Sequence, residues 1–441
     1  MNSRRVAVLL LLALAVVQVG AQQVSQKKDI AVFKLSYYQW DIPDSVLGGI
    51  DEEIRGVFVN IGRFNVLGMT QRLEPGDLNE FIDKIKAYKE ERAEIPDTVQ
   101  MGREFFTQAD FDRLVGSFIV VVPSVASYVL EVKDSGEFHV ALKTSFSFVN
   151  VEQGTTFAQA FVETEGTQKS PDGAARSALD GIAMLLTYEI RKIPEFQLKT
   201  GVLEVHGGEV ILELGRDMGI KVGDEFVLVA SRVLQSGKTL TTENGLLVIK
   251  EVSDEVSVGK VLYAQPRPQE GDQLREFPLL GVETTPYLHV ASGLVYDPGK
   301  ITAMAGIRGS ISRGFYGFRP IFALEVPFIT NIIFALPLNL YLGGEYMLYL
   351  GRLSVAPMAA LGIGGAYLWY LDASEDQKFA FTNFGVKANV AISYLFNKKL
   401  KFTADVGYMN MFSFVPLKYV NDVFFPDYDG LFIGAGLTIK L

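Results

Sequence analysis

The sequence predicts a multi-domain protein in which an α/β (α+β) domain and a small β domain precede an eight-stranded antiparallel transmembrane β-barrel. Three observations predict this architecture. Long stretches after about residue 280 alternate between apolar and polar side chains, which is typical of strands with one apolar and one wet face. The first residues have the form of an export signal. Proline- and glycine-containing breaks near residues 194 and 266–271 divide the remainder into two units.

Residues 1–21 are predicted to be a signal peptide. Arg4 and Arg5 precede an apolar run at 6–17, and Val19-Gly20-Ala21 supplies the small residues of a cleavage site. The run is too short to cross a membrane as a helix. The chain has no cysteine, which excludes a lipid-modified cysteine, disulfides and thiolate chemistry.

Residues 22–195 are predicted to form the α/β domain. Apolar residues at helical spacing predict helices, and alternating or buried-looking runs predict strands. The expected helices cover 44–60, 77–92, 106–114 and 171–192, and the expected strands cover 29–33, 64–67, 117–123, 128–133, 138–149 and 156–163.

Short motifs in this domain resemble a known type. They are Ile30-Ala31-Val32-Phe33, the segment 62–67 (GRFNVL), and Gln108-Ala109-Asp110-Phe111 ahead of Gly116-Ser117-Phe118. They resemble the α/β domain of curli-secretion-channel lipoproteins and the N-terminal domain of TolB. The chain departs from the curli channel in lacking the lipid-bearing cysteine and a pair of pore-forming hairpins. The resemblance therefore implies a periplasmic assembly or adaptor role.

Residues 196–277 are predicted to form the small β domain. Gly219, Gly223 and Asp224 precede a Phe-Val-Leu strand, which indicates a tight turn with glycine at positive φ and aspartate bonded to the backbone. The segment resembles the C-terminal SH3-like module of flagellar assembly protein T. No P-loop or dinucleotide fingerprint stands at a strand-to-helix junction.

Residues 278–441 are predicted to form the transmembrane barrel. In 384–396 and 431–441 every second residue is apolar over ten residues or more, a length that suits a tilted bilayer crossing. The residues predicted to face lipid are Ile307, Leu340, Val390, Ile392, Val406 and Leu437. A soluble, lipocalin-like barrel also alternates, but its exterior would carry the charges. Here the polar set is rich in glycine and serine, which favours the membrane interpretation.

Charged residues on the opposite face are predicted to meet in the lumen. They are Glu283, Arg308, Glu325, Glu345, Lys387 and Asp405. Side chains fill an eight-stranded barrel, so these groups are expected to form a paired network that plugs it. The alternative is a narrow ion path.

The links between the predicted strands alternate in length, which gives an orientation. Short links fall at 314–317, 351 and 397–399, and longer ones near 292–299, 329–333, 372–378 and 412–429. Bacterial outer-membrane barrels have short periplasmic turns and longer outer loops, so the N-terminal domains are expected in the periplasm. The chain ends in Leu441, whereas many such barrels end in an aromatic residue.

Composition argues against several function classes. The net charge of −10 and pI near 5.1 argue against nucleic-acid binding. His139, His206 and His289 lie far apart in the sequence, and there is no G-x-S-x-G motif. We therefore expect no catalytic residue, no metal and no cofactor. Asp427, Asp429 and the loop 372–376 could hold calcium through oxygen ligands, although an acidic outer loop is the simpler interpretation.

The expected function is that of an outer-membrane-anchored structural or adaptor protein. Its partners would be outer-membrane lipid and a periplasmic protein or peptidoglycan, and not nucleic acid. One alternative is a soluble periplasmic flagellar or secretion assembly protein with a C-terminal docking barrel. Another is a rim-type lipid-modifying enzyme, for which His289 with Ser292 is the nearest candidate pair.

Overall fold

The structure is a computed structural model of the 441-residue chain. It describes residues 24–37, 42, 44–91, 98–101, 104–110, 114, 119–295, 298–328, 335–368, 379–413, 419–420, 423–424 and 428–441. The predicted signal peptide, and most of the long loops expected at one end of the barrel, lie outside these ranges.

The N-terminal domain is a five-stranded sheet covered by helices. The sheet order is β2-β1-β5-β6-β7, with β1 parallel to β2 and β5 and the remaining pairs antiparallel. The elements are β1 (Lys28–Val32), α2 (Asp44–Asn60), β2 (Phe64–Gly68), α3 (Leu78–Glu91), β3 (Thr98–Met101), β4 (Glu104–Thr107), β5 (Ile119–Val132), β6 (Phe138–Asn150), β7 (Thr155–Gln168), α5 (Pro171–Asp180) and α6 (Ile182–Lys192).

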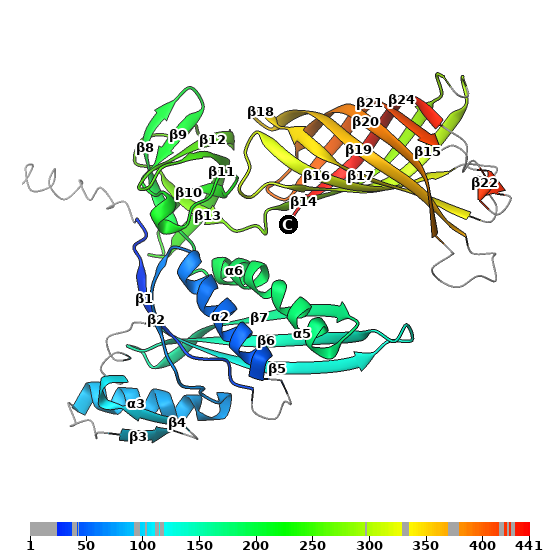
Figure 1. Ribbon diagram of the computed structural model, residues 1–441. Coiled ribbons are helices and arrows are strands. Elements are labelled where there is room, and N and C mark those ends of the chain that lie inside the picture. The colour runs from blue at the N-terminus through cyan, green and yellow to red at the C-terminus, as the bar shows by residue number, and fades with distance from the viewer. Residues whose placement is uncertain are drawn as a thin grey trace, which may run out of the picture.

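Both faces of this sheet are buried, because successive residues of β1 point to opposite sides. Ile30 and Val32 belong to a core shared with α2, α5 and α6, whereas Ala31 and Phe33 belong to a second core with α3 and the β3–β4 hairpin. Figure 1 shows the helices α2, α5 and α6 on one side of the sheet and α3 with β3–β4 on the other.

Four of the expected elements are corrected by the structure. Phe106 lies in strand β4, not at the start of a helix, because its side chain packs edge-on against Phe33 in the second core. The strands expected at 117–123 and 128–133 are one strand, β5, which passes through a bulge between Val125 and Ser127. The helix expected over 171–192 is divided into α5 and α6 at Gly181.

The second domain is a closed six-stranded barrel. Its strand order is β10-β11-β12-β9-β8-β13. The strands are β8 (Lys199–His206), β9 (Glu209–Leu212), β10 (Glu225–Val233), β11 (Thr239–Val252), β12 (Ser257–Ala264) and β13 (Gln273–Phe277). Its interior is aliphatic apart from Phe226 and Met218.

The C-terminal domain is a closed eight-stranded antiparallel barrel. The order β17-β16-β15-β14-β24-β21-β20-β19 closes through β17–β19, and the short β18 continues β17 along β19. The strands are β14 (Val282–Ser292), β15 (Ile301–Ile311), β16 (Phe318–Phe328), β17 (Ala335–Tyr346), β18 (Leu348–Leu350), β19 (Leu353–Leu368), β20 (Phe379–Leu395), β21 (Leu400–Ser413) and β24 (Tyr428–Lys440). Every neighbouring pair is connected in sequence except β14–β24, where the two ends of the domain meet.

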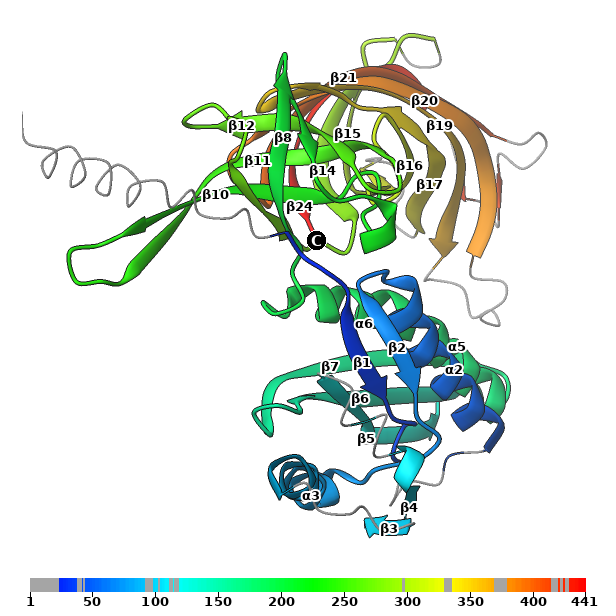
Figure 2. The same cartoon turned by 90° about the vertical axis from the view of Figure 1, so that its left-hand side faces the viewer.

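The small barrel lies at the short-turn end of the large one. Figures 1 and 2 show it in front of that end, with the α/β domain beside both. Val227, Leu246 and Leu262 of the small barrel share a buried cluster with Leu395 at the end of β20. The guanidinium of Arg352, in the β18–β19 turn, lies 3.7 Å from the ring centre of Tyr263. Among the described residues no helix is long and apolar enough to cross a membrane.

Candidate functional sites in the barrel lumen and at the domain junction

The middle of the large barrel holds a buried polar network. Lys387 pairs with Glu325, and its ammonium lies 3.1 Å from His289 Nδ1. Because an ammonium can only donate, Nδ1 accepts that bond, and Nε2 therefore carries the proton that it donates to Asp405 at 3.0 Å. Tyr287 and Tyr341 donate to Glu325 at 3.1 and 3.3 Å. Four strands, β14, β16, β20 and β21, thus contribute polar or charged groups that bond to one another inside the lumen.

A second polar layer lies nearer the short-turn end. Glu283 accepts from Lys401 at 2.6 Å and lies 3.3 Å from Arg319. Arg319 is also 4.0 Å from Glu345. Lys440, in the last strand of the large barrel, pairs at 2.5 Å with Glu225 of the small barrel. This layer links the lumen to the domain that covers its end.

The lumen is filled rather than open at this level. The cavity lined by His289, Arg308, Tyr341 and Lys387 measures about 20 Å³, room for about one water molecule. The six charged residues expected in the lumen are all buried, from 0 % exposed at Glu325 to 9 % at Arg308 and Asp405. Side chains therefore occupy the lumen at this level, as expected for an eight-stranded barrel.

The exterior of the barrel is apolar. The six residues expected to face lipid are all exposed: Ile307, Leu340, Val390, Ile392, Val406 and Leu437. Val390, Val406 and Ile433 pair side by side across β20, β21 and β24. They are joined by exposed aromatic residues such as Phe322, Phe384 and Phe402. Apolar area of this extent on a soluble surface would mark an interaction site or a membrane-facing belt.

Arg319 contributes to the lumen but is not among the residues that the sequence analysis places there. Extending the alternation of β16 backwards from Phe322 places Arg319 inward. His289 was considered with Ser292 as a rim pair, yet the burial pattern of β14 points His289 into the lumen and Ser292 to the other face. That pair is therefore not assembled.

The three domains meet at a second cluster, which we call the junction. It comprises Arg63, Arg191, Asp224, Glu276 and Arg313. Arg191, at the end of α6, donates through Nε to Glu276 at 2.6 Å, through a terminal nitrogen to Asp224 at 2.8 Å, and to the Leu279 carbonyl at 2.9 Å. Arg63 donates to Glu276 at 2.8 Å, and Arg313 Nε donates to Asp224 at 2.8 Å.

The predicted turn motif of the small barrel lies at the centre of the junction. Gly219 and Gly223 have φ of +77° and +83°, and Asp224 accepts from the Lys221 amide at 2.8 Å, as a tight turn requires. A Cβ on Gly219 would lie 1.8 Å from the Ile61 carbonyl oxygen of the α/β domain, and one on Gly223 would lie 2.0 Å from the Ser312 carbonyl oxygen of the large barrel. These glycines are required for domain contact as well as for the turn.

Electrostatics stabilise the junction. Burial alone would raise the pKa of the Glu276 carboxyl, but the guanidinium groups of Arg63 and Arg191 outweigh burial and lower it to about 2. Burial likewise opposes the charge of Arg191, yet Asp224 and Glu276 raise its pKa above the ordinary value. Both residues are at most 2 % exposed at the side chain. Removing either partner would leave a buried charge with fewer compensating groups.

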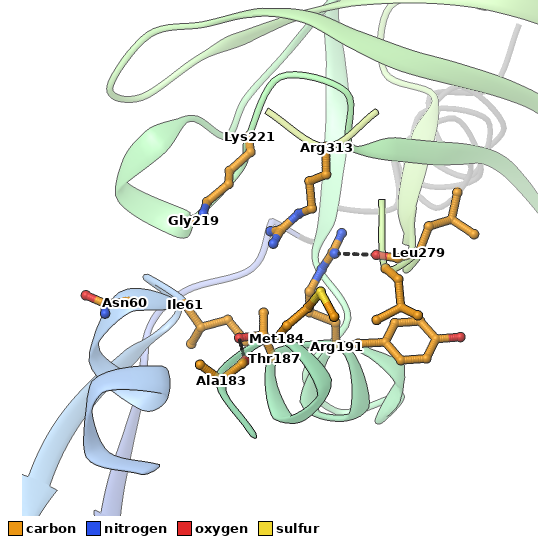
Figure 3. A pocket seen from close by; sticks show the side chains of 12 residues that line it. Asn60, Ile61, Ala183, Met184, Thr187, Arg191, Gly219, Lys221, Leu279 and Arg313 are labelled. Atoms are coloured by element: carbon orange, nitrogen blue, oxygen red, sulfur yellow. Dashed lines mark hydrogen bonds between the residues drawn. The ribbon is translucent and has the colours of Figure 1, made fainter. Parts of the chain in front are cut away.

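A pocket of about 200 Å³ opens beside the junction. Its walls come from α2 and α6, from the turn of the small barrel, from the linker into β14, and from the β15–β16 turn. Figure 3 shows Lys221 and Arg313 pointing into it from one side and Arg191 facing them from α6. Burial lowers the pKa of Lys221, and Arg313 lowers it further.

Several sequence-based candidates lie outside the described residues, including the loop 372–376 and Asp427. Asp429 is described and buried, and it accepts from the amides of Leu294 and Val295, the latter at 3.0 Å. Within the described ranges no group of three potential metal ligands comes together.

No family model matches the sequence, and no curated protein matches it. Solved structures do match parts of it. The PelC dodecamer from Paraburkholderia phytofirmans is 13% identical, covers 37% of this chain and 88% of its own, and has a TM-score of 0.23. Neisserial surface protein A is 14% identical over 36% of this chain and 96% of its own, with a TM-score of 0.26. The outer membrane protein OprG from Pseudomonas aeruginosa is 12% identical over 36% and 96%, with a TM-score of 0.23.

These three matches each cover little more than a third of this chain, and the closed eight-stranded barrel is established by the pairing of its own strands. The matched structures named above are not curli, TolB or flagellar proteins. The resemblance of the two N-terminal domains to those families stays a prediction.

Proposed function

We propose that the protein is a structural or adaptor protein anchored in a bacterial outer membrane by its C-terminal barrel. Its two N-terminal domains face the periplasm and bind another envelope component, either a periplasmic protein or peptidoglycan. The observation that carries this proposal is the combination of a filled, ion-paired lumen with an apolar exterior. Such a barrel can hold a protein in a bilayer but offers no route for solutes.

The junction supports the adaptor part of the proposal. Arg191 bonds to Asp224 and Glu276 of the small barrel and to the carbonyl of Leu279 in the linker to the large barrel. Glu225 of the small barrel pairs with Lys440 of the last transmembrane strand. A partner bound to the N-terminal domains would therefore be held at a fixed position relative to the membrane.

A projecting hairpin is a candidate surface for that partner. Strands β10 and β11 extend beyond the small barrel, as Figure 2 shows, and end at exposed Val233, Leu234 and Leu240. Exposed apolar residues at the tip of a paired ribbon are available to bind another chain.

Membrane insertion is tested by fractionation with a matched pair of variants. The full-length chain should be recovered in the outer membrane and should migrate faster in SDS when unboiled. Val406→Arg puts a charge in the apolar belt, which costs about 2–4 kcal/mol at the bilayer midplane, and should reduce the fast-migrating form. Leu240→Arg, on the exposed hairpin, should leave that form unchanged.

A soluble wild-type chain with no mobility shift, or equal behaviour of the two variants, would show that the barrel is not in lipid. The C-terminal barrel would then act as a docking domain of a soluble assembly protein.

Partner binding is tested separately, by photo-crosslinking from position 234 in cells and comparison with position 238 in the hairpin turn and position 129 on the α/β domain. Crosslinks from 234 that Leu240→Arg removes would support the adaptor role.

A further inference from the structure

We propose that the pocket beside the junction is a binding site for a phosphate group, with Lys221 and Arg313 as its ligands. This goes beyond the proposed function, because it assigns a small-molecule site to the place where the three domains meet. The site would take either free phosphate or the phosphate of a phospholipid headgroup.

The charge balance of the junction points to an anion. Four cations, Arg63, Arg191, Lys221 and Arg313, surround two carboxylates, Asp224 and Glu276, which leaves two positive charges unbalanced in a protein whose net charge is −10. In the part of the chain that the structure describes, no carboxylate forms an ion pair with Lys221. Lys221 is exposed, so solvent screens part of its repulsion with Arg313, and a bound anion would offset the remainder.

The geometry leaves donors available for a ligand. Arg313 uses Nε for Asp224, and the described residues accept no hydrogen bond from its two terminal nitrogens. Those nitrogens and the Lys221 ammonium point into the same pocket in Figure 3. A guanidinium fork beside an ammonium suits a phosphate group, which has oxygens enough for both.

The remaining walls are suited to a ligand that is only partly polar. Ile61, Met184 and Leu280 line the pocket, and Met184 is 54 % exposed. Arg313 lies two residues beyond exposed Ile311, the last residue of β15, and so follows the outward-facing residues of that strand. In an inserted barrel this face would pass from the hydrocarbon region to the headgroups at about Arg313. A volume of about 200 Å³ accommodates a phosphate with a few further atoms, but not a whole lipid.

The test uses the full-length chain in detergent, with two probes measured by isothermal titration calorimetry. The probes are inorganic phosphate and dihexanoyl phosphatidylglycerol, and the zwitterionic phosphatidylcholine of the same chain length is the lipid control. Lys221→Gln should weaken binding of the recognised probe at least 10-fold. Lys238→Gln, which removes an exposed lysine of the β10–β11 hairpin turn, should leave binding unchanged. Far-UV circular dichroism and the mobility shift in SDS verify that both variants are folded.

Tighter binding of phosphatidylglycerol would assign the site to a lipid headgroup, and binding of phosphate alone would assign it to a free phosphate. Either result with the expected Lys221 dependence supports the proposal. If the wild-type chain binds neither probe, or if Lys221→Gln binds as well as Lys238→Gln, the proposal is wrong. Because no arm requires a bilayer, its failure is distinguishable from failure of the membrane anchor.

Discussion

The Nε of Arg191 lies 2.6 Å from Glu276 Oε1, and these two residues, 85 positions apart in the chain, join the α/β domain to the last strand of the small barrel. Neither side chain is more than 2 % exposed. The same arginine also bonds to Asp224 and to the carbonyl of Leu279. One side chain thus fixes three segments that are separate in sequence.

Arg191→Met should weaken the junction by about 3–5 kcal/mol, because it leaves Glu276 and Asp224 buried with fewer partners. We expect limited proteolysis to release the α/β domain faster, while the SDS mobility shift of the large barrel is kept. Lys192→Met is the matched control, since Lys192 lies on the surface, where it pairs with Glu189 and lies over the ring of Tyr188. Equal cleavage rates in the two variants would contradict a structural role for Arg191.

Acid should loosen the junction before it unfolds the domains. The pKa of Glu276 is about 2 in the folded protein and ordinarily 4.5. A depressed folded pKa contributes stability that is complete above 4.5 and is lost as the pH falls toward 2. The lowered pKa corresponds to a contribution of about 3 kcal/mol to the free energy of unfolding at neutral pH.

The measurement is hydrogen exchange of the peptide containing Glu276 between pH 6 and pH 2.5, corrected for intrinsic rates. Protection of the wild-type chain should fall across this range. In Glu276→Gln, which cannot titrate, protection should be lower at pH 6 and should change little with pH. A wild-type chain with constant protection would refute the assignment.

Lys387 and Glu325 should stabilise the barrel only as a pair. Lys387→Met leaves the carboxylate of Glu325 buried and should cost about 3–5 kcal/mol. The double variant Lys387→Met with Glu325→Gln removes both charges and keeps hydrogen-bonding atoms for Tyr287 and Tyr341, so it should recover most of that loss. The temperature at which the fast-migrating form disappears reports the difference, and additive losses would show that the two residues are not coupled.

Gly223 should tolerate no side chain, for two separable reasons. Its φ is +83°, and a Cβ would lie 2.0 Å from the Ser312 carbonyl oxygen. Gly237 has a similar φ of +77° but open space around it. Gly237→Ala should therefore lower the free energy of unfolding by roughly 1–2 kcal/mol, which is the cost of the left-handed backbone conformation alone. Gly223→Ala should lower it further and loosen the contact with the large barrel. Thermal unfolding of the two variants separates these terms.

The alternation of β20 and β24 made the large barrel predictable, because a strand between an apolar exterior and a polar lumen must change chemistry at every residue. The same alternation in β16, β20 and β21 made the faces of Glu325, Lys387 and Asp405 predictable. Helix ends were less predictable. A weak local pattern placed Phe106 at the start of a helix, whereas its packing against Phe33 holds it in strand β4.

The sequence by itself determined the periodicity of the barrel strands and the tight turn at Gly219–Asp224. The turn depends on residues near one another in the chain, and the periodicity depends on one repeated contrast between an apolar exterior and a polar lumen. Only the tertiary structure decided that Asp224 joins Arg191 and Arg313, and that His289 lies between Lys387 and Asp405. A charged residue has the same local preference whether its partner is 3 or 98 positions away, so the pairing depends on how the domains and strands meet.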